Sequence, residues 1–447
     1  MKTIVTILIG LFVTFCSQRQ ELLEQIKQSG ELRVVTRNSL TTCYRVEDDL
    51  AGFEYTLARH FADELGVRLK MILVDTDSQA VEVLERTEAD LVVGLGTIAP
   101  NNTSIHFGPV YQRVSQQIVY RRKRKRLENL RDLAGKLVEI SSDYGYADML
   151  RAFTDKNPDI VWRERPSLST AELLLLVLRG KVDIAIASSN EISLLRQRYP
   201  ELNTAFDIGN PRSLAWGILA NADNSLYVPL LAFFEKMQKD KKLVDIIEHH
   251  YGHVSHFDYV ETQRFLRRAR RQLPKYMVHF KAAATNHNLD WRLLSAIGYQ
   301  ESHWNPKAVS PTGVQGIMML TTNTAKQLGV VDRTDEKESI FGGARYFAGL
   351  KGRLPARIED PDRTWFALAA YNIGLGHLED ARILTQRAGA DPDRWRDVRK
   401  FLPLISQKEW YVKTRYGYAR GHEPVQFVQN IRRYYDSLVW LDTMGNQ

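Results

Sequence analysis

A glutamate inside an apolar helical segment is the strongest candidate for acid–base chemistry in this sequence. Residues 290–302 predict a helix in which Leu294, Ile297 and Glu301 recur three or four positions apart, so the carboxyl group lies on the apolar stripe. A carboxyl group held there loses hydration, which raises its pKa and keeps it protonated near neutral pH, as a general acid requires. The alternative for this helix taken alone is a partly buried glutamate paired with an arginine.

The ends of this helix can also be predicted. Asp290 is a favourable N-cap residue, and Asn305 and Pro306 are residues at which a helix does not easily continue. Glu301 therefore falls in the last turn, beside a loop, where a partly buried carboxyl group can still meet a substrate.

The segment around Glu301 belongs to a long stretch with helical periodicity. From residue 257 onward the sequence has no strand-like runs, and apolar residues recur at intervals of three and four. The predicted helices are 262–287, 290–302, 322–329, 338–352, 363–373, 376–387 and 423–441. We therefore expect residues 257–447 to form an all-α domain.

Residues 21–256 have a different pattern, in which short β-rich runs alternate with helical ones. Strands are predicted at 32–36, 69–74, 89–96, 136–141 and 182–189, and helices at 55–66 and 170–181. Gly66 is a plausible C-cap for the first of these helices. Alternating strands and helices predict parallel α/β structure, and two such lobes enclose a cleft by default.

This N-terminal part resembles the periplasmic solute-binding proteins of the amino-acid type. The resemblance is carried by GELRV at 30–34, GFEYTLARHFADELG at 52–66, ADLVVG at 89–94, FGPVY at 107–111 and GKVDIAIA at 180–187. It implies a two-lobed, non-catalytic domain. We expect this domain to regulate or position the enzyme, with a muropeptide or stem peptide of the cell wall as the ligand to test; the alternative is an empty cleft that serves only as a scaffold.

One position in this N-terminal part departs from the amino-acid-binding relatives. In those relatives an arginine about six residues before the FGPVY-like element clamps the α-carboxylate of the ligand, and here that position holds Asn101. A free amino acid should therefore bind poorly, unless Arg37 or Arg113 takes over that contact.

The helical part resembles the lytic transglycosylase domain, a relative of goose-type lysozyme. The matching segments are ESHWNP at 301–306, SPTGVQGIMMLT at 310–321, TA at 324–325, SIFGGARYFAGL at 339–350 and ALAAYNIGLGH at 367–377. With segments 397–407 and 416–435 and the upstream half, the chain resembles the membrane-bound lytic murein transglycosylases. The fold expected is thus a two-lobed α/β binding-protein-like domain followed by an all-α lysozyme-like domain.

The resemblance carries roles to individual residues. Glu301 matches the catalytic acid and base, Ser302 the small polar residue beside it, and Met319 stands where many relatives have glutamine, which puts one substrate hydrogen bond in doubt. The other positions expected to contact substrate, from the glycine-rich loop and the AYN motif, are Gly313, Gly316, Met318, Tyr371 and Asn372.

A single catalytic carboxyl group fits the reaction that this resemblance implies. Ordinary glycosidases use two carboxyl groups. Here Glu301 would protonate the oxygen that links N-acetylmuramic acid to N-acetylglucosamine and then deprotonate the muramic C6 hydroxyl, which closes onto C1. The product is a 1,6-anhydro sugar, so the enzyme is a lyase that needs no metal or organic cofactor. The alternatives are a hydrolytic muramidase on the same fold and a glycan-binding periplasmic sensor.

The composition limits the partners. The chain has 447 residues, so two or three compact units are expected, and its formal net charge of +8 favours contact with an acidic polymer. The run RRKRKR at 121–126 predicts either a solvated loop or an electrostatic contact with wall polymer or lipid headgroups. Nucleic acid is disfavoured, because the chain is expected to be exported and carries no recognition motif.

The first residues predict export. Lys2 precedes an apolar run from Ile4 to Phe15, which suits a signal segment over residues 1–20 and is too short to span a bilayer. Cys16 lies where a lipid anchor would attach, but the bulky Phe15 before it disfavours lipidation. Together with the resemblance to the membrane-bound lytic murein transglycosylases, export implies a peripheral protein on the periplasmic face of the outer membrane.

Overall fold

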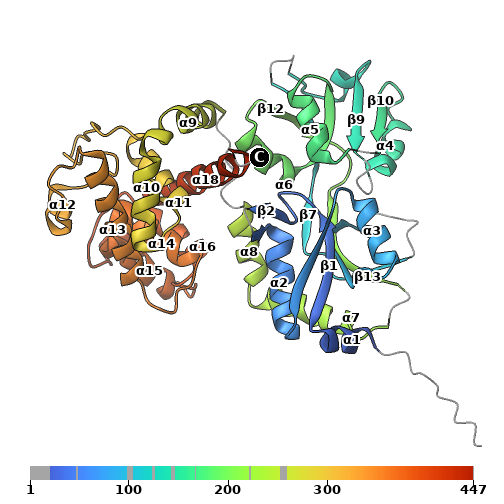
Figure 1. Ribbon diagram of the computed structural model, residues 1–447, viewed down its shortest axis with the longest axis horizontal. Coiled ribbons are helices and arrows are strands. Elements are labelled where there is room, and N and C mark those ends of the chain that lie inside the picture. Colours follow the sequence, from blue (N-terminus) through green and yellow to red (C-terminus); the bar gives the residue numbers. More distant parts are fainter. Residues whose placement is uncertain are drawn as a thin grey trace, which may run out of the picture.

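The computed structural model describes residues 21–46, 49–97, 104–122, 126–141, 146–166, 168–220, 223–251 and 259–445. Figure 1 shows two α/β lobes on one side and a helical body on the other. This confirms the predicted fold class. The predicted signal segment with Cys16, the residue Asn101 and the middle of the basic run lie outside the described residues.

A mixed sheet forms the first lobe, in the strand order β4-β1-β5-β13-β6, with β7 paired to β13. The strands are β1 (Glu31–Arg37), β4 (Arg68–Val74), β5 (Leu91–Gly96), β6 (Ile105–Phe107), β7 (Gln112–Val114) and β13 (Arg212–Leu219). The predicted parallel arrangement is right for β1, β4 and β5 but wrong for the sheet as a whole, since β13 is antiparallel to β5. The reason is that β13 returns from the second lobe and enters the sheet in the opposite direction.

Helices cover both faces of this sheet and supply its core. They are α1 (Leu22–Ser29), α2 (Phe53–Leu65), α3 (Asp77–Glu85), α7 (Tyr227–Lys239) and α8 (Lys242–Tyr251), and a small hairpin joins β2 (Tyr44–Val46) to β3 (Asp49–Ala51). In α2, Leu57 and Phe61 are wholly buried, and Gly66 ends the helix with a φ of 74°. The predicted C-cap is therefore confirmed, because this left-handed conformation favours glycine.

The second lobe has its own five-stranded sheet, in the order β10-β9-β11-β8-β12. Its strands are β8 (Gln116–Arg121), β9 (Leu137–Ser141), β10 (Val161–Arg165), β11 (Ile184–Ser188) and β12 (Leu202–Asp207). Its helices are η1 (Leu130–Leu133), α4 (Tyr146–Thr154), α5 (Thr170–Leu178) and α6 (Ser189–Arg198). The sheet is again mixed, because β8 runs antiparallel to both β11 and β12.

The helical body begins, within the described residues, at Tyr259. Its elements are α9 (Tyr259–Arg271), α10 (Leu273–His287), α11 (Trp291–Ser302), α12 (Thr322–Leu328), α13 (Glu336–Arg353), α14 (Asp362–Ile373), α15 (Leu375–Arg387), α16 (Trp395–Phe401), η2 (Leu402–Ser406), α17 (Lys408–Tyr411) and α18 (His422–Gly445). The prediction of a single helix over 262–287 is wrong. The helix is interrupted at Gln272, because Pro274 lies in the first turn of α10 and cannot continue the hydrogen bonds of the preceding helix.

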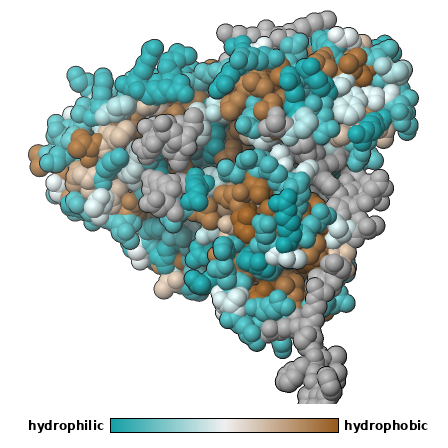
Figure 2. All heavy atoms as spheres, turned by 45° about the vertical axis from the view of Figure 1, so that its right-hand side comes forward, coloured by the Kyte–Doolittle hydropathy of each residue, from teal (hydrophilic) through white to brown (hydrophobic). Residues whose placement is uncertain are grey.

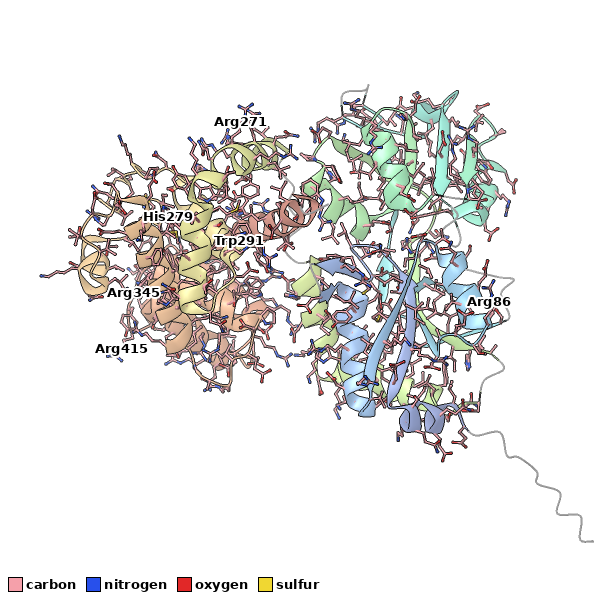
Figure 3. The ribbon with its side chains drawn as sticks, viewed as in Figure 1. Arg86, Arg271, His279, Trp291, Arg345 and Arg415 are labelled. Atoms are coloured by element: carbon pink, nitrogen blue, oxygen red, sulfur yellow. The ribbon has the colours of Figure 1, made fainter. Side chains whose placement is uncertain are left out.

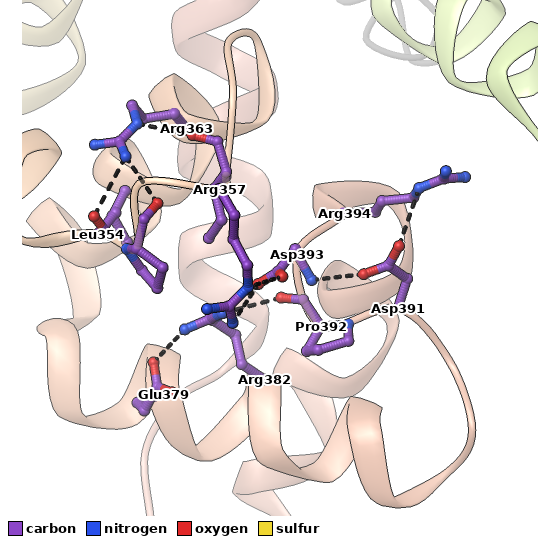
Figure 4. Close-up of polar contacts among 11 residues, drawn as sticks. Leu354, Arg357, Arg363, Glu379, Arg382, Asp391, Pro392, Asp393 and Arg394 are labelled. Atoms are coloured by element: carbon purple, nitrogen blue, oxygen red, sulfur yellow. Dashed lines mark hydrogen bonds and ion pairs between the residues drawn. The ribbon is translucent and has the colours of Figure 1, made fainter.

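A buried arginine fixes the loop between α15 and α16 (Figure 4). Arg382 is 3% exposed, and its Nε donates to the carbonyl oxygen of Pro392 at 2.9 Å. It also forms ion pairs with Glu379 and Asp393, and Asp393 is shared with Arg357. The helical periodicity gave no sign of this network, which joins residues from three segments of the chain.

Ion pairs join α8 of the first lobe to the helical body. Arg399 donates to both carboxylate oxygens of Glu248, at 2.7 and 3.0 Å. Arg432 in α18 donates to the carbonyl oxygens of Glu248 and His249, at 2.8 and 2.7 Å. Closer to the C-terminal end of α18, the ring of Trp440 contacts that of Tyr199 from the second lobe, with centroids 5.2 Å apart. The two domains therefore share a specific polar junction.

Figure 2 shows hydrophilic residues over most of the visible face and hydrophobic ones in separate patches. Within the described part of the chain, no helix combines the length and the apolar character that a bilayer crossing requires.

Cys43 is a buried free thiol, and burial raises its pKa to about 12.

Candidate active site

Helix α11 positions Glu301. Asp290 caps the helix as predicted, because its Oδ1 accepts a hydrogen bond from the backbone N–H of Arg292 at 2.8 Å. The helix ends at Ser302, earlier than Asn305, because His303 and Trp304 both take left-handed conformations with φ of 54° and 58°. Glu301 therefore lies in the last turn, as the sequence predicts.

The end of α11 is held by the indole of Trp304. This side chain is 1% exposed, and its Nε1–H donates to the carbonyl oxygen of Ser295 at 2.8 Å. The ring also packs near Tyr299 and Phe265, with centroid distances of 4.7 and 5.9 Å. A large buried side chain with a satisfied donor fixes the turn that follows Glu301.

Burial controls the ionisation of Glu301. The residue keeps some exposed surface, but its carboxyl group is largely removed from water, and this loss of hydration raises its pKa to about 8. No described residue forms a hydrogen bond or an ion pair with this carboxyl group. The alternative reading, a glutamate paired with an arginine, is therefore wrong for the described part of the chain. The arrangement instead leaves a protonated carboxyl group available near neutral pH.

We expect Glu301→Gln to stabilise the protein above neutral pH. The carboxyl group ionises near pH 4.5 in the unfolded chain and near pH 8 in the folded one. Below pH 4.5 both the folded and the unfolded wild type hold the proton, so glutamine gives no gain in stability. As the pH rises toward 8 the unfolded state loses its proton first, and the free energy of unfolding of the wild type falls.

This expectation is checked by melting temperatures of the wild type and Glu301→Gln at pH 4.5 and pH 8, the two pKa values involved. The gap in favour of the variant should widen by several degrees toward the higher pH, because one pKa unit corresponds to about 1.4 kcal/mol. Glu359→Gln, which removes an exposed glutamate of the same domain, is the matched control. An unchanging gap would contradict the raised pKa.

Tyr371 lies within the electrostatic reach of Glu301. Burial, followed by the charge of Glu301, raises the pKa of Tyr371 well above its usual value, so its hydroxyl stays protonated. That hydroxyl donates to the carbonyl oxygen of Met318 at 2.8 Å. The rings of Tyr346 and Phe427 flank Tyr371, with centroids 5.2 and 6.3 Å away. Helices α13, α14 and α18 thus hold this tyrosine between the acid and the glycine-rich loop.

The glycine-rich loop contains two glycines with different surroundings. Gly316 has a φ of 85°, and a Cβ there would lie 1.8 Å from the carbonyl oxygen of Arg333. Gly313 has a φ of 79°, but a Cβ there would meet no described atom within 4 Å. Nη1 of Arg333 donates to the carbonyl oxygens of Gly313 and Leu320, at 2.9 and 3.0 Å. The loop is therefore packed at Gly316 and open at Gly313.

Ser302, at the end of α11, and Met318, within this loop, are both buried. The hydroxyl of Ser302 donates to the carbonyl oxygen of Ile317 at 2.9 Å and accepts from the backbone N–H of Asn305 at 3.1 Å. Met318 is fully buried, and its backbone N–H donates to Ser339 Oγ at 3.2 Å. Both residues tie the loop to α11 and α13 and hold it against the helix that carries Glu301.

The remaining predicted positions are more open. Asn372 is exposed in the last turn of α14, next to Tyr371. Met319 is partly exposed and has a φ of 48°. The structure therefore brings Glu301, Tyr371 and the loop together and leaves Asn372 and Gly313 accessible from outside. Sequence reasoning missed Arg333, for which no local pattern gave a signal.

The cleft between the two α/β lobes is nearly filled by its own side chains. Its free volume is about 20 Å³. Arg37 forms an ion pair with Asp77 at 2.6 Å, and Arg212 approaches the same carboxylate at 3.8 Å. Arg212 also lies over the ring of Tyr146, 5.2 Å from its centroid. Arg113, the other arginine proposed from the sequence to bind a carboxylate, is exposed on β7.

The described residues contain no candidate metal site. Among the residues that the structure describes, no group of three or more histidine, cysteine, aspartate and glutamate side chains is arranged to hold a metal ion.

Comparisons with known proteins agree with the two-part architecture. The family described as "Transglycosylase SLT domain" matches residues 279–392, and "Bacterial extracellular solute-binding proteins, family 3" matches residues 32–253. The solved structure of a cysteine-binding protein from Campylobacter jejuni is 16% identical, with a TM-score of 0.47, over 54% of this chain and 97% of that protein.

Two curated relatives cover almost the whole chain. A protein from Pseudomonas fluorescens strain Pf-5 is 43% identical over 97% of this chain and 90% of its own length. Another, from Pseudomonas syringae pv. syringae strain B728a, is 43% identical over 97% of this chain and 88% of its own length. Both are named membrane-bound lytic murein transglycosylase F. At this identity and coverage, the chain belongs to the membrane-bound lytic murein transglycosylase F family.

Proposed function

We propose that this protein is a peptidoglycan lytic transglycosylase, a carbon–oxygen lyase, with Glu301 as its single acid and base. The observation that carries the proposal is a carboxyl group at the end of α11 that no described residue pairs with by a hydrogen bond or an ion pair. Its pKa is raised to about 8 by burial alone, and no other acidic side chain of the described chain perturbs it. A glycosidase with two carboxyl groups would place them near each other across the scissile bond. A solitary carboxyl group suits a reaction in which the substrate supplies its own nucleophile.

The proposed reaction balances one proton. Protonated Glu301 donates to the oxygen that joins N-acetylmuramic acid to N-acetylglucosamine, and the bond from C1 to that oxygen breaks. The resulting carboxylate then takes the proton from the muramic C6 hydroxyl, whose oxygen bonds to C1. Glu301 is thereby protonated again, and the glycan ends in a 1,6-anhydro sugar. Holding the C6 hydroxyl beside C1 favours ring closure over attack by water.

The other site residues divide into two groups in this proposal. Tyr371, Asn372 and Gly313 lie where sugar can reach them and contact the substrate. Ser302, Met318 and Gly316 are positioning residues, since their contacts run to the loop, to α13 and to Arg333. The catalytic domain of the proposal is residues 257–447.

The mass of the products tests the reaction type. Digestion of purified sacculi should release muropeptides that carry the anhydromuramyl mass, about one water lighter than hydrolytic products, because the C6 hydroxyl is the nucleophile. Mass spectrometry of the digest checks this. Reducing muramic ends as the main product would support a hydrolytic muramidase instead, and binding of sacculi without any release would support a glycan-binding sensor.

We propose export by residues 1–20 and a peripheral position on the periplasmic face of the outer membrane. The shared name of the relatives, membrane-bound, supports membrane association. Cell fractionation should recover the protein with outer membranes, and washing with high salt should release it if it is peripheral. Recovery only after detergent extraction would contradict that position.

Residues 21–256 are proposed to regulate the enzyme and to bind a cell-wall muropeptide or stem peptide in preference to a free amino acid. In the closed cleft, Arg37 and Arg212 both face Asp77, so a ligand carboxylate must displace that side chain first. A free amino acid offers few contacts to offset the loss of this ion pair, whereas a longer peptide offers more.

Calorimetry on the full chain tests this proposal. Common amino acids should give no micromolar binding. Arg37 and Arg212 already face Asp77 and so do not supply a ligand carboxylate with the free energy of binding, about 1.4 kcal/mol for each tenfold gain in affinity, that tight binding requires. Asp77→Asn should strengthen amino-acid binding, since it weakens the competing ion pair. Micromolar binding of a free amino acid to the wild type would refute the proposal.

A further inference from the structure

An arginine-lined pocket lies between the second lobe and the helical body, away from the lobe–lobe cleft and from Glu301. Its volume is about 520 Å³. The charged side chains that line it are Arg121 of β8, Arg198 of α6, Glu201 of the α6–β12 connection, and Arg267, Arg270 and Arg271 of α9. Five arginines thus face a single carboxylate in a cavity large enough for a small ligand.

Asp436 acts on the charge of Arg198 and Tyr44 hydrogen-bonds to it, so the excess of positive charge in the pocket rests on the other four arginines. The one carboxylate, Glu201, accepts from the neutral side chain of Gln263 at 2.7 Å. Nε of Arg121 is buried and has no hydrogen-bond partner among the described residues. Arg267 and Arg271 are exposed and make no hydrogen bond or ion pair within the described part of the chain. Buried donors normally have partners, so the pocket is suited to an anionic ligand.

Helix α9 connects this pocket to the catalytic helix. Gln263, Arg267 and Arg270 recur at helical spacing and face the pocket, and Figure 3 shows Arg271 on the outside of the helical body. The other side of α9 packs inward, where the ring of Phe265 contacts that of Tyr299 at 4.7 Å. The pocket is therefore built on a helix that also supports the turn carrying Glu301.

The described ends of the basic run at 121–126 line two cavities. Arg121 lines the pocket, and Arg122 and Arg126 line a second cavity of about 550 Å³ beside β12. Residues 123–125 lie outside the described residues.

We propose that this pocket binds the carboxylates of peptidoglycan stem peptides and so holds the wall beside the catalytic domain. The arginine fork matches carboxylate geometry, and a concave pocket admits a flexible peptide more easily than the flat surface of a bilayer. The inference rests on peptidoglycan being the substrate.

Co-sedimentation with purified sacculi tests the pocket separately from catalysis. All proteins carry Glu301→Gln to prevent digestion, and the test variant adds Arg267→Gln and Arg271→Gln, both on the exposed side of α9. We expect a loss of affinity of about five- to thirtyfold at low salt, because two exposed charge contacts are removed. The difference should disappear near 1 M salt, where the Debye length falls to about 3 Å.

Two controls make this test specific. Arg59→Gln with Arg86→Gln removes the same charge from exposed positions of the first lobe and should leave binding unchanged. Sacculi whose carboxylates have been converted to amides should bind the pocket variant and its parent equally.

Three outcomes would overturn the proposal. They are equal losses in the pocket variant and the first-lobe control, no loss in either, and a loss that appears with vesicles containing phosphatidylglycerol but not with sacculi. Failure of the product-mass experiment with unchanged sacculus binding would instead refute the proposed reaction and leave the pocket standing.

Discussion

Replacing Glu301 with glutamine should lower the rate of sacculus lysis by at least about 10²–10⁴-fold, because acid–base groups typically contribute that much. The amide has nearly the same shape as the carboxylic acid but cannot give a proton to the leaving oxygen. Burial raises the pKa of the carboxyl group to about 8, so the wild type holds the proton near neutral pH that the amide cannot supply. Release of soluble muropeptides from labelled sacculi measures the effect.

Glu359→Gln is the matched control for this experiment, since it makes the same change at an exposed glutamate of the same domain. It should lyse sacculi like the wild type. Glu301→Gln is expected to be at least as stable as the wild type, so lost activity will not reflect unfolding. Lysis within a few-fold of wild type by the folded variant would exclude Glu301 as the catalytic acid.

Gly316→Ala should destabilise the catalytic domain by more than about 3 kcal/mol, an effect at the upper end of those seen for single substitutions. An added Cβ would lie 1.8 Å from the carbonyl oxygen of Arg333, and the φ of 85° is unfavourable for any residue with a Cβ. The loop must then move, and it carries the Met318 carbonyl that accepts from Tyr371. Thermal melting and sacculus lysis should both show the loss.

Gly313→Ala is the comparison that separates the two causes. Its φ of 79° carries a similar backbone cost, but its Cβ would meet open space. We expect a loss of stability of only about 1–2 kcal/mol, which thermal melting measures independently of substrate binding. Equal losses in the two variants would mean that backbone conformation, and not the contact with Arg333, sets the requirement for glycine at residue 316.

The sequence by itself determined the features that depend on local patterns. The apolar spacing in residues 290–302 and the capping residue Asp290 predicted α11 with Glu301 in its last turn. The alternation of β-rich and helical runs predicted strands β1, β4, β5, β9 and β11 and helices α2 and α5, but not the other strands and helices of the two lobes. These predictions succeeded because hydrophobic periodicity and capping act between residues that are close along the chain.

Only the tertiary structure decided the features that join distant segments. The antiparallel entry of β13 into the first sheet, the bond from Tyr371 to Met318, and the approach of Arg333 to Gly316 each depend on residues far apart in sequence or on the path of the chain. The arginine pocket likewise combines β8, α6 and α9. No local pattern encodes such contacts, because they arise only when burial of the apolar faces brings separate elements together.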